Sequence, residues 1–428
     1  MNNLVIICAI LLLVLLFLKV PVYIAVLSAS AVYFIGTPGM NLSIFAQKTI
    51  SGAEGLSLLA IPFFVCAGIF MNYTGVTKRI MNCCEVLTAR MPGGLAQVNI
   101  LLSTLMGGLS GSSLADAAMQ CKMLVPTMES KGYSKSFSTV ITAASGMVVP
   151  LIPPGVGLII YGCINNISIG KLFIAGIGPG IVLCVTLMIF THFLSKKRGY
   201  LPSRTTKIPV SEKIAAVKPG FLPLLLPIII IGGVRIGIFT ASEAGTVAIV
   251  YAVLLGLLYK ELTLKNVMQG CKETVTTTAS IMLIVAAATC FSWILTKEQI
   301  PQQFSQWMIS NIHNKYVFLI MVNIFLLIVG MFIEGNASMI VLAPLLHPVA
   351  MAYGIDDIHF AMVYIFNCTI GAFTPPMGTL MFVSCGITKC PTKDFIKEAV
   401  PFYILFAIDI IVLTYIPQLT TFLVNVFY

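Results

Sequence analysis

Two short polar stretches interrupt apolar sequence and carry the residue types best suited to binding ions. GLSGSSLAD (108–116) contains three serines and an aspartate, and EGNAS (334–338) contains an acid, an amide and a serine. A small hard cation such as sodium is bound by oxygen ligands and gains from the negative end of a short helix. Both stretches are therefore candidate cation sites.

A proline-containing run follows each polar stretch. The first is ASGMVVPLIPPGVG (144–157) and the second is NCTIGAFTPPMGT (367–379). Proline lacks a backbone donor and clashes with the preceding turn, so each run must unwind a helix. Unwinding frees carbonyl oxygens, and at membrane depth these require protein, water or an ion as partner. We therefore predict two symmetry-related sodium sites, made by Ser110, Ser112, Gly146, Val149 and Pro150, and by Gly335, Asn336, Thr369, Ala372 and Thr374.

The helices that begin after the polar stretches offer free N–H groups to an anion. Such helix starts can hold a carboxylate without a buried arginine. The predicted substrate contacts are Ser112, Ser113, Asp116, Asn336, Ser338, Pro154 and Pro376. Ser113 and Asp116 also match a capping box, in which case they could complete a helix end.

Four acids lie within apolar runs, where a charge is costly and therefore a functional candidate. Asp116 and Glu334 stand beside the polar stretches and could carry a proton or assist a cation. Glu243, in TASEAG, suits the first turn of a helix. Asp409 has no role that the sequence assigns.

The composition of the chain is that of a membrane protein. Of 428 residues, 58% are hydrophobic and 9% are charged, which predicts an all-α polytopic membrane protein in a lipid bilayer. The net charge is +10, and the basic residues are scattered among short loops. Membrane proteins carry an excess of Lys and Arg in cytoplasmic loops, and this rule explains the charge better than nucleic-acid binding does. Twelve cysteines lack the spacing of a zinc or redox site, and we interpret them as small buried side chains.

Each polar stretch lies in an apolar segment too long for one span, which predicts a re-entrant helical hairpin. The two halves of the chain also correspond: Asn99 matches Asn323 and Gly111 matches Gly335 at an offset of 224. Pro153-Pro154 matches Pro375-Pro376 at an offset of 222. These matches predict an internal repeat.

The distribution of positive charge predicts that the two repeats are inverted. If each hairpin returns to the side of the membrane from which it entered, 19 Lys and Arg residues lie inside and five lie outside. The first hairpin then enters from the cytoplasm, the second from outside, and both chain termini are periplasmic. Inverted repeats with broken helices are typical of secondary transporters.

We accordingly divide the chain into a first repeat (1–195), a basic cytoplasmic linker or arm (196–220) and a second repeat (221–428). The predicted elements are scaffold helices in 1–75 and 221–296, hairpins at 97–126 and 317–351, broken helices at 137–162 and 358–386, and helices at 173–194 and 402–424.

Several motifs resemble the large membrane subunit of the tripartite ATP-independent periplasmic (TRAP) transporters. They are GLSGSSLAD, PPGVGLIIYG (153–162), IGKLFIAGIGPG (169–180), TASEAGTVAIVY (240–251) and IGAFTPPMGTLMF (370–382). The resemblance covers essentially the whole chain and implies a sodium-driven elevator-type importer of organic anions in the bacterial inner membrane. It also implies a small four-helix membrane subunit and a periplasmic substrate-binding protein as partners, and a C4-dicarboxylate, another carboxylate or a sialic acid as substrate.

Two other functions are consistent with particular residues. A proton-coupled organic-anion carrier would use Asp116 or Glu334 as its proton carrier. An intramembrane serine protease would use Ser110 of GLSG and needs a base, for which only His347 lies well inside an apolar segment. Ser110 corresponds to Glu334 in the second repeat, so the repeat favours transport over an enzyme.

Overall fold

A computed structural model describes residues 3–18, 20–204, 206 and 209–428, and throughout these ranges the regular structure is helical. Six of the described helices are long and apolar enough to cross a membrane, or eight spans if two bent helix pairs each count as one. The predicted all-α polytopic fold is confirmed. Lys19 and Lys207, which the charge count places inside, lie outside the described residues.

The helices alternate between long apolar spans and short segments that end at glycine, proline or a polar cap. Their bounds are α1 (Asn3–Phe17), α2 (Val22–Gly36), α3 (Leu42–Ser51), η1 (Leu56–Leu59), α4 (Ala60–Asn72), α5 (Val76–Thr88), α6 (Gly94–Ser110), α7 (Ser113–Ser130), α8 (Lys135–Gly146), α9 (Val156–Asn165), α10 (Ile169–Lys197), α11 (Val210–Ile236), α12 (Ala241–Leu258), α13 (Leu264–Lys297), α14 (Ile300–Asn311), α15 (Lys315–Phe332), α16 (Gly335–Ala352), α17 (Asp357–Phe373), α18 (Thr379–Thr388), α19 (Thr392–Tyr415) and α20 (Gln418–Phe427).

The first polar stretch joins two antiparallel helices. Helix α6 ends at Ser110, the next residue is Gly111 with φ of +61°, and α7 begins at Ser113. Glycine adopts this left-handed conformation without the penalty that a side chain brings. Gln120 of α7 donates to Ser103 of α6, so the two helices run back along one another. The second polar stretch likewise separates α15 from α16, and Phe318 of α15 stacks on Tyr353 just beyond the end of α16.

Both proline-containing runs interrupt helices. Helix α8 ends at Gly146 and α9 begins at Val156, whereas α17 ends at Phe373 and α18 begins at Thr379. The Pro153–Pro154 and Pro375–Pro376 peptide bonds are both cis. The unwound segments therefore lie between short helices, where their carbonyl groups are free of a regular helical ladder.

The structure differs from the predicted elements in five places. Helices α3, α5 and α14 occupy segments without a predicted span, because these helices are amphipathic or mixed in composition and the prediction followed long apolar runs. Residues 210–220, predicted as linker, belong to α11. The predicted final helix 402–424 is instead α19 followed by α20, bent by 48°, because Pro417 cannot continue the hydrogen-bond ladder of α19.

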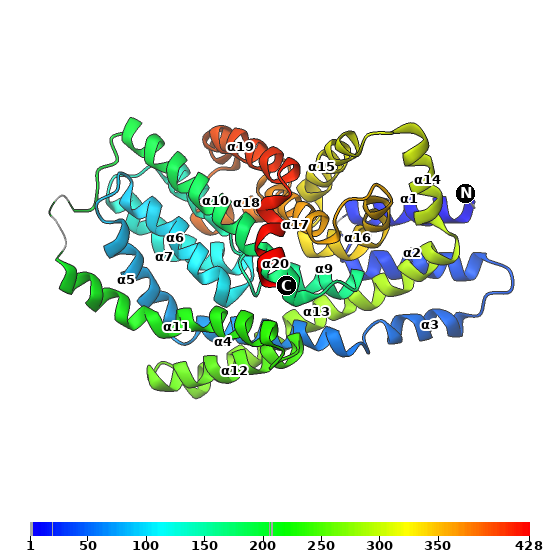
Figure 1. Ribbon diagram of the computed structural model, residues 1–428, viewed down its shortest axis with the longest axis horizontal. Coiled ribbons are helices and arrows are strands. Elements are labelled where there is room, and N and C mark those ends of the chain that lie inside the picture. Colours follow the sequence, from blue (N-terminus) through cyan, green and yellow to red (C-terminus); the bar gives the residue numbers. More distant parts are fainter. Residues whose placement is uncertain (1–2, 19, 205, 207–208) are drawn as a thin grey trace.

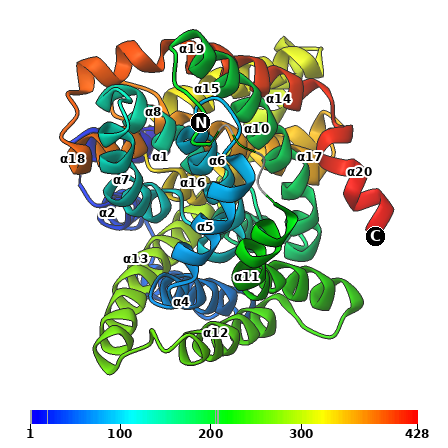
Figure 2. The ribbon, with the colours of Figure 1, turned by 90° about the vertical axis from the view of Figure 1, so that its left-hand side faces the viewer.

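The two hairpins lie on opposite halves of the molecule along its long axis. Figure 1 shows α6 and α7 toward one end and α16 toward the other, with α9, α13 and α17 between them. Figures 1 and 2 both place α4, α12 and α13 along one side of the molecule and α15 and α19 along the opposite side. The polar breaks consequently meet in the interior.

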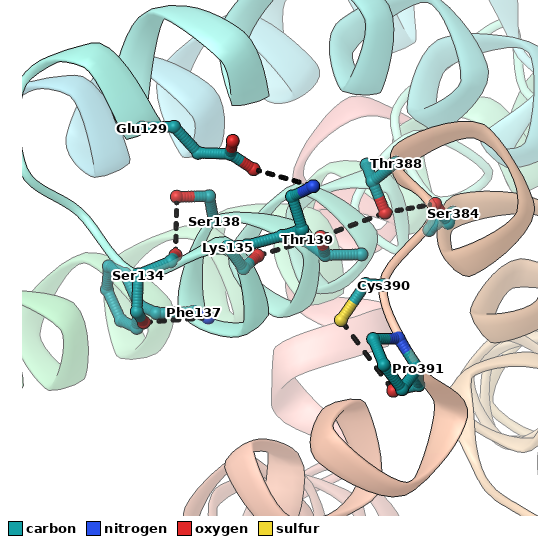
Figure 3. A network of polar contacts seen from close by, with 10 residues as sticks. All are labelled: Glu129, Ser134, Lys135, Phe137, Ser138, Thr139, Ser384, Thr388, Cys390 and Pro391. Atoms are coloured by element: carbon teal, nitrogen blue, oxygen red, sulfur yellow. Dashed lines mark hydrogen bonds and ion pairs between the residues drawn. The ribbon is translucent and has the colours of Figure 1, made fainter.

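The two broken helices also contact one another directly. Thr139 of α8 donates to Thr388 at the end of α18 over 3.1 Å, and Thr388 donates to the Ser384 carbonyl over 2.8 Å (Figure 3). Lys135 at the start of α8 pairs with Glu129 of α7 at 3.7 Å. These contacts join the first hairpin and both broken helices into one packed unit.

Helices α15 and α17 cross at a pair of glycines, and we expect Gly371→Ala to destabilise the protein. A methyl group at Gly371 would lie 2.6 Å from the Cα atom of Gly330, so the helices would have to separate. Overpacking of this kind costs about 1–3 kcal/mol. Thermal unfolding of the purified protein measures the effect, and Gly386→Ala is the control because a methyl group there meets no atom within 4 Å. Equal melting temperatures for the two variants would contradict the prediction.

Candidate functional site

Both polar stretches line one cavity of about 540 Å³. The first contributes Ser110, Gly111, Ser112 and Ser113, and the second contributes Glu334, Gly335 and Asn336. A cavity of this size is typical of small-molecule sites, which measure about 300–1,000 Å³. The remaining lining residues come from the two broken helices and from α4, α7, α13 and α16: Val65, Gly68, Ile69, Asn72, Leu114, Ala115, Pro150, Val156, Gly157, Thr276, Thr277, Ser280, Ile281, Ile284, Met339, Ile340, Ile365, Cys368, Thr369, Ala372 and Thr379.

The tip of the first hairpin packs against the first broken helix without space to spare. The Val156 N–H donates to the Gly111 carbonyl over 3.3 Å. A methyl group at Gly111 would lie 2.7 Å from the Pro154 carbonyl oxygen. On the other side of the tip, a methyl group at Gly68 of α4 would lie 2.8 Å from the Ser110 carbonyl oxygen. Backbone oxygens of the tip and of the first broken helix therefore lie close together here, with α4 packed against them.

Ser110 presents an oxygen that the surrounding protein does not satisfy. Its Oγ atom is buried and has no hydrogen-bond partner among the residues described. Buried polar groups are normally paired, so such an atom points to a missing water, ion or ligand. Because Ser110 also lines the cavity, this oxygen is available to a bound cation.

The tip of the second hairpin packs on the second broken helix and reaches the first. A methyl group at Gly335 would lie 3.5 Å from the Cys368 Cβ atom of α17, and one at Gly157 of α9 would lie 3.9 Å from Asn336 Oδ1. Glu334 is the N-cap of α16 and its Oε2 atom accepts from the Ala337 N–H over 3.1 Å. The second tip thus contacts α17 and α9, which belong to different predicted repeats.

Two helix N-termini face the cavity. Ser113, Leu114 and Ala115 at the start of α7 line it, as do Gly335 and Asn336 at the start of α16. The first N–H groups of a helix lack intrahelical partners and carry partial positive charge. The arrangement can therefore hold a carboxylate.

Among the described lining residues, Glu334 is the only acid, and lysine, arginine and histidine are absent. An anionic substrate in this cavity would meet the positive helix ends but no basic side chain. A second positive charge would have to come from a bound cation. The cavity thus combines oxygen ligands for a cation with N–H donors for an anion.

The predicted site residues divide into two groups. Those that line the cavity are Ser110, Ser112, Ser113, Pro150, Gly335, Asn336, Thr369 and Ala372. Those that do not line it are Gly146, Val149, Thr374, Asp116, Ser338, Pro154 and Pro376. Gly146, Val149 and Pro154 are buried behind the first tip, whereas Pro376 is exposed. The structure therefore gathers the tips together but leaves parts of the proline runs behind them.

The capping box predicted at Ser113 and Asp116 is wrong by one residue. Ser112 is the N-cap of α7, and its Oγ atom accepts from the Ala115 N–H over 3.4 Å. Asp116 is 1% exposed and its Oδ2 atom accepts from Ser103 over 2.7 Å and from Gln120 over 2.8 Å. Asp116 thus lies between the two helices of the hairpin and away from the cavity.

Ser338 is likewise held by its neighbours. The Ser338 carbonyl oxygen accepts from the Tyr364 hydroxyl over 3.1 Å. The Ser338 hydroxyl lies 3.4 Å from the Tyr364 hydroxyl oxygen. Glu243 is confirmed as a first-turn partner, because it forms a capping box with Thr240. Asp409 accepts from Thr186 over 3.0 Å and links α19 to α10.

The structure adds cavity residues that the sequence analysis missed. Thr276, Thr277 and Ser280 of α13 and Asn72 of α4 line the cavity. The available signal was the hydroxyl-rich run TVTTTAS (274–280) at the start of an apolar span. Polar side chains within such a span usually face a partner or a water-filled space rather than lipid.

The geometry around Ser110 does not support protease chemistry. None of the four histidines lines the cavity, and Nδ1 of His347 on α16 instead lies 3.3 Å from the Tyr161 hydroxyl of α9. A serine nucleophile requires a base within hydrogen-bond distance. Ser110 therefore has no partner for that reaction within the described part of the chain.

Comparisons with known proteins point to one family. Residues 9–419 match the family described as "Tripartite ATP-independent periplasmic transporter, DctM component". The chain is 39% identical over 414 residues to the sialic acid TRAP transporter large permease protein SiaM of Vibrio cholerae, with 96% of each chain covered.

Other relatives are named for different acids. The 2,3-diketo-L-gulonate TRAP transporter large permease protein YiaN of Escherichia coli is 36% identical over 400 residues, covering 93% of this chain and 94% of the relative. The C4-dicarboxylate TRAP transporter large permease protein DctM of Pseudomonas aeruginosa is 35% identical over 381 residues, covering 89% of each.

A solved transporter shares the fold. The crystal structure of YdaH from Alcanivorax borkumensis aligns with a TM-score of 0.60 at 13% sequence identity, covering 92% of this chain and 96% of that one. At this identity the likeness concerns the helix arrangement alone.

Proposed function

We propose sodium-coupled import of an organic acid anion as the function of this chain, which belongs to the DctM component family of tripartite ATP-independent periplasmic transporters. Members of the family are transporter permeases rather than enzymes, and the chain is a multi-pass membrane protein. The proposed substrate is a sialic acid or a C4-dicarboxylate, the classes for which two of the relatives are named.

The observation that carries the proposal is the charge of the cavity. Two helix starts and a single acid, Glu334, line it, without a basic side chain among the described lining residues. A carboxylate beside Glu334 would be repelled unless a cation accompanied it. Binding of anion and cation would then be mutually dependent, which is the thermodynamic basis of symport.

Backbone and hydroxyl oxygens support sodium as that cation. Ser110 Oγ is buried without a partner among the described residues, and carbonyl oxygens of the first unwound segment, including that of Pro154, lie against the first tip. Hard cations prefer oxygen ligands of this kind. We retain two sodium sites, one at each tip, as part of the proposal, with the other predicted residues behind the cavity as candidate carbonyl ligands.

The proposed cycle is an elevator movement in a bacterial inner membrane. The hairpins and broken helices would move as a unit against a scaffold that includes α4 and α13. The close contact between Gly68 of α4 and the Ser110 carbonyl of the first tip lies at the boundary between the moving unit and this scaffold. The proposed partners are a small four-helix membrane subunit and a periplasmic binding protein that delivers the substrate.

The test is uptake of labelled N-acetylneuraminic acid and succinate into proteoliposomes that contain the chain with its small subunit, with the binding protein supplied outside. A sodium gradient at equal pH on both sides should drive accumulation of at least one of the two acids. Uptake that follows a pH gradient and ignores sodium would instead support the proton-coupled carrier. Counterflow exchange of the labelled acid should distinguish a carrier from a channel.

A further inference from the structure

Besides the two hairpin tips, α13 forms a side of the cavity that is rich in hydroxyl groups, and we call its residues Thr276, Thr277 and Ser280 the α13 wall. Thr276, Thr277 and Ser280 lie on α13, which is a candidate membrane span of 34 residues. All three side chains are exposed in the structure, at the point where α13 passes from a polar first part to the apolar run that begins at Ile281. Because hydrocarbon offers such groups no hydrogen bonds, the cavity is the environment that suits them.

The three hydroxyls retain bonding capacity toward the cavity. Thr276 donates to the Lys272 carbonyl over 2.6 Å and Ser280 donates to the Thr276 carbonyl over 2.9 Å, which leaves the lone pairs of both oxygens as acceptors. The Thr277 hydroxyl has no hydrogen-bond partner among the described residues, so it can both donate and accept. Asn72 adds a side-chain amide to the same cavity.

This wall differs chemically from the two tips. The tips offer helix N–H groups and cation ligands, including the unpartnered Ser110 oxygen, which suit a carboxylate and its counter-ion. The α13 wall has neutral hydroxyls, of which Thr276 and Ser280 can accept and Thr277 can both donate and accept. Alcohol groups match such a wall, whereas a second carboxylate would find no positive charge there.

We propose that Thr276, Thr277 and Ser280 of α13 bind the hydroxyl groups of the substrate and thereby select a polyhydroxylated sugar acid over a short dicarboxylate. The inference rests on the proposed function, since it assigns a substrate class to the same cavity. A ligand that lacks these hydroxyl groups would leave the hydroxyls of the site without hydrogen-bond partners. The site therefore binds such a ligand less tightly than a polyhydroxylated one.

The experiment uses the complete transporter and compares Thr277→Val and Ser280→Ala, combined, with Thr274→Val. Thr274 lies on the same helix, donates to the Gly270 carbonyl over 2.7 Å and does not line the cavity. We expect the double variant to raise the apparent KM for N-acetylneuraminic acid by about tenfold, because loss of uniform binding raises KM at constant kcat. At saturating substrate, the sodium concentration for half-maximal uptake should not change.

Three outcomes would overturn the inference. They are an unchanged KM for the double variant, an equal rise in KM for Thr274→Val, or wild-type uptake confined to succinate. Each of these leaves sodium-coupled anion import in place. Absence of sodium-driven uptake of either acid by the wild type would instead reject the proposed function itself.

Discussion

Replacing Gly111 by alanine is expected to lower sodium-driven uptake more than tenfold. Gly111 has φ of +61°, and a methyl group there would lie 2.7 Å from the Pro154 carbonyl oxygen. The left-handed conformation costs an L-residue about 1–2 kcal/mol, and relief of the clash must displace the tip. Since about 1.4 kcal/mol corresponds to a factor of ten in binding, displacement of Ser110 and Ser112 should severely reduce transport.

Gly132→Ala is the matched control for this variant. Gly132 also has a positive φ, of +86°, but a methyl group there meets no atom within 4 Å. It shares the conformational strain without the contact at the tip. Uptake and thermal unfolding are measured for both variants. Wild-type uptake by Gly111→Ala, or an equal loss in Gly132→Ala, would show that the contact between tip and broken helix is not needed.

Replacing Glu334 by glutamine is expected to weaken sodium activation about a hundredfold. Glu334 is the only acid among the described residues that line the cavity. A unit charge about 6 Å from a cation contributes about 3 kcal/mol at an effective dielectric constant of 20. Glutamine can still accept from the Ala337 N–H, so the helix cap is retained.

The measurement is initial uptake as a function of sodium concentration. Glu243→Gln makes the same substitution in the capping box of α12, away from the cavity, and should activate like the wild type. If Glu334→Gln required no more sodium than Glu243→Gln, the acid would have no part in cation binding. The proton-coupled alternative predicts instead that Glu334→Gln abolishes dependence on a pH gradient.

The breaks in the helices were predictable because single residues enforce them. Proline removes a donor wherever it lies, and Gly111 permits a left-handed turn, so the ends of α6, α8 and α17 follow from local chemistry. Which of the flanking residues reach the cavity depends on how the two repeats pack. For that reason Ser110 and Asn336 line it, whereas Gly146 and Ser338 do not.

Other features depend on contacts that sequence alone does not provide. Ser112 and Ser113 are both suitable caps, and the choice between them depends on where Gly111 ends the preceding helix. The partners of Asp116 lie on the neighbouring helix and one turn along its own, in positions without a recognisable spacing motif. The α13 wall was missed because a threonine-rich run does not indicate which neighbour it faces.

The central claim is that the two hairpins enter the membrane from opposite sides and meet at one cavity. Ser130 and Ala352 are the last residues of α7 and α16, correspond at the repeat offset of 222, and are both exposed. Each can be replaced by cysteine in a Cys271→Ser background, which removes the one cysteine that is exposed among the residues described.

The decisive measurement is the labelling of these two variants with a membrane-impermeant thiol reagent, in spheroplasts and in inside-out vesicles. The account predicts that Ala352→Cys reacts only in spheroplasts and Ser130→Cys only in inside-out vesicles. Reaction of both cysteines from the same side would contradict inverted hairpins and, with them, the proposed pair of sodium sites.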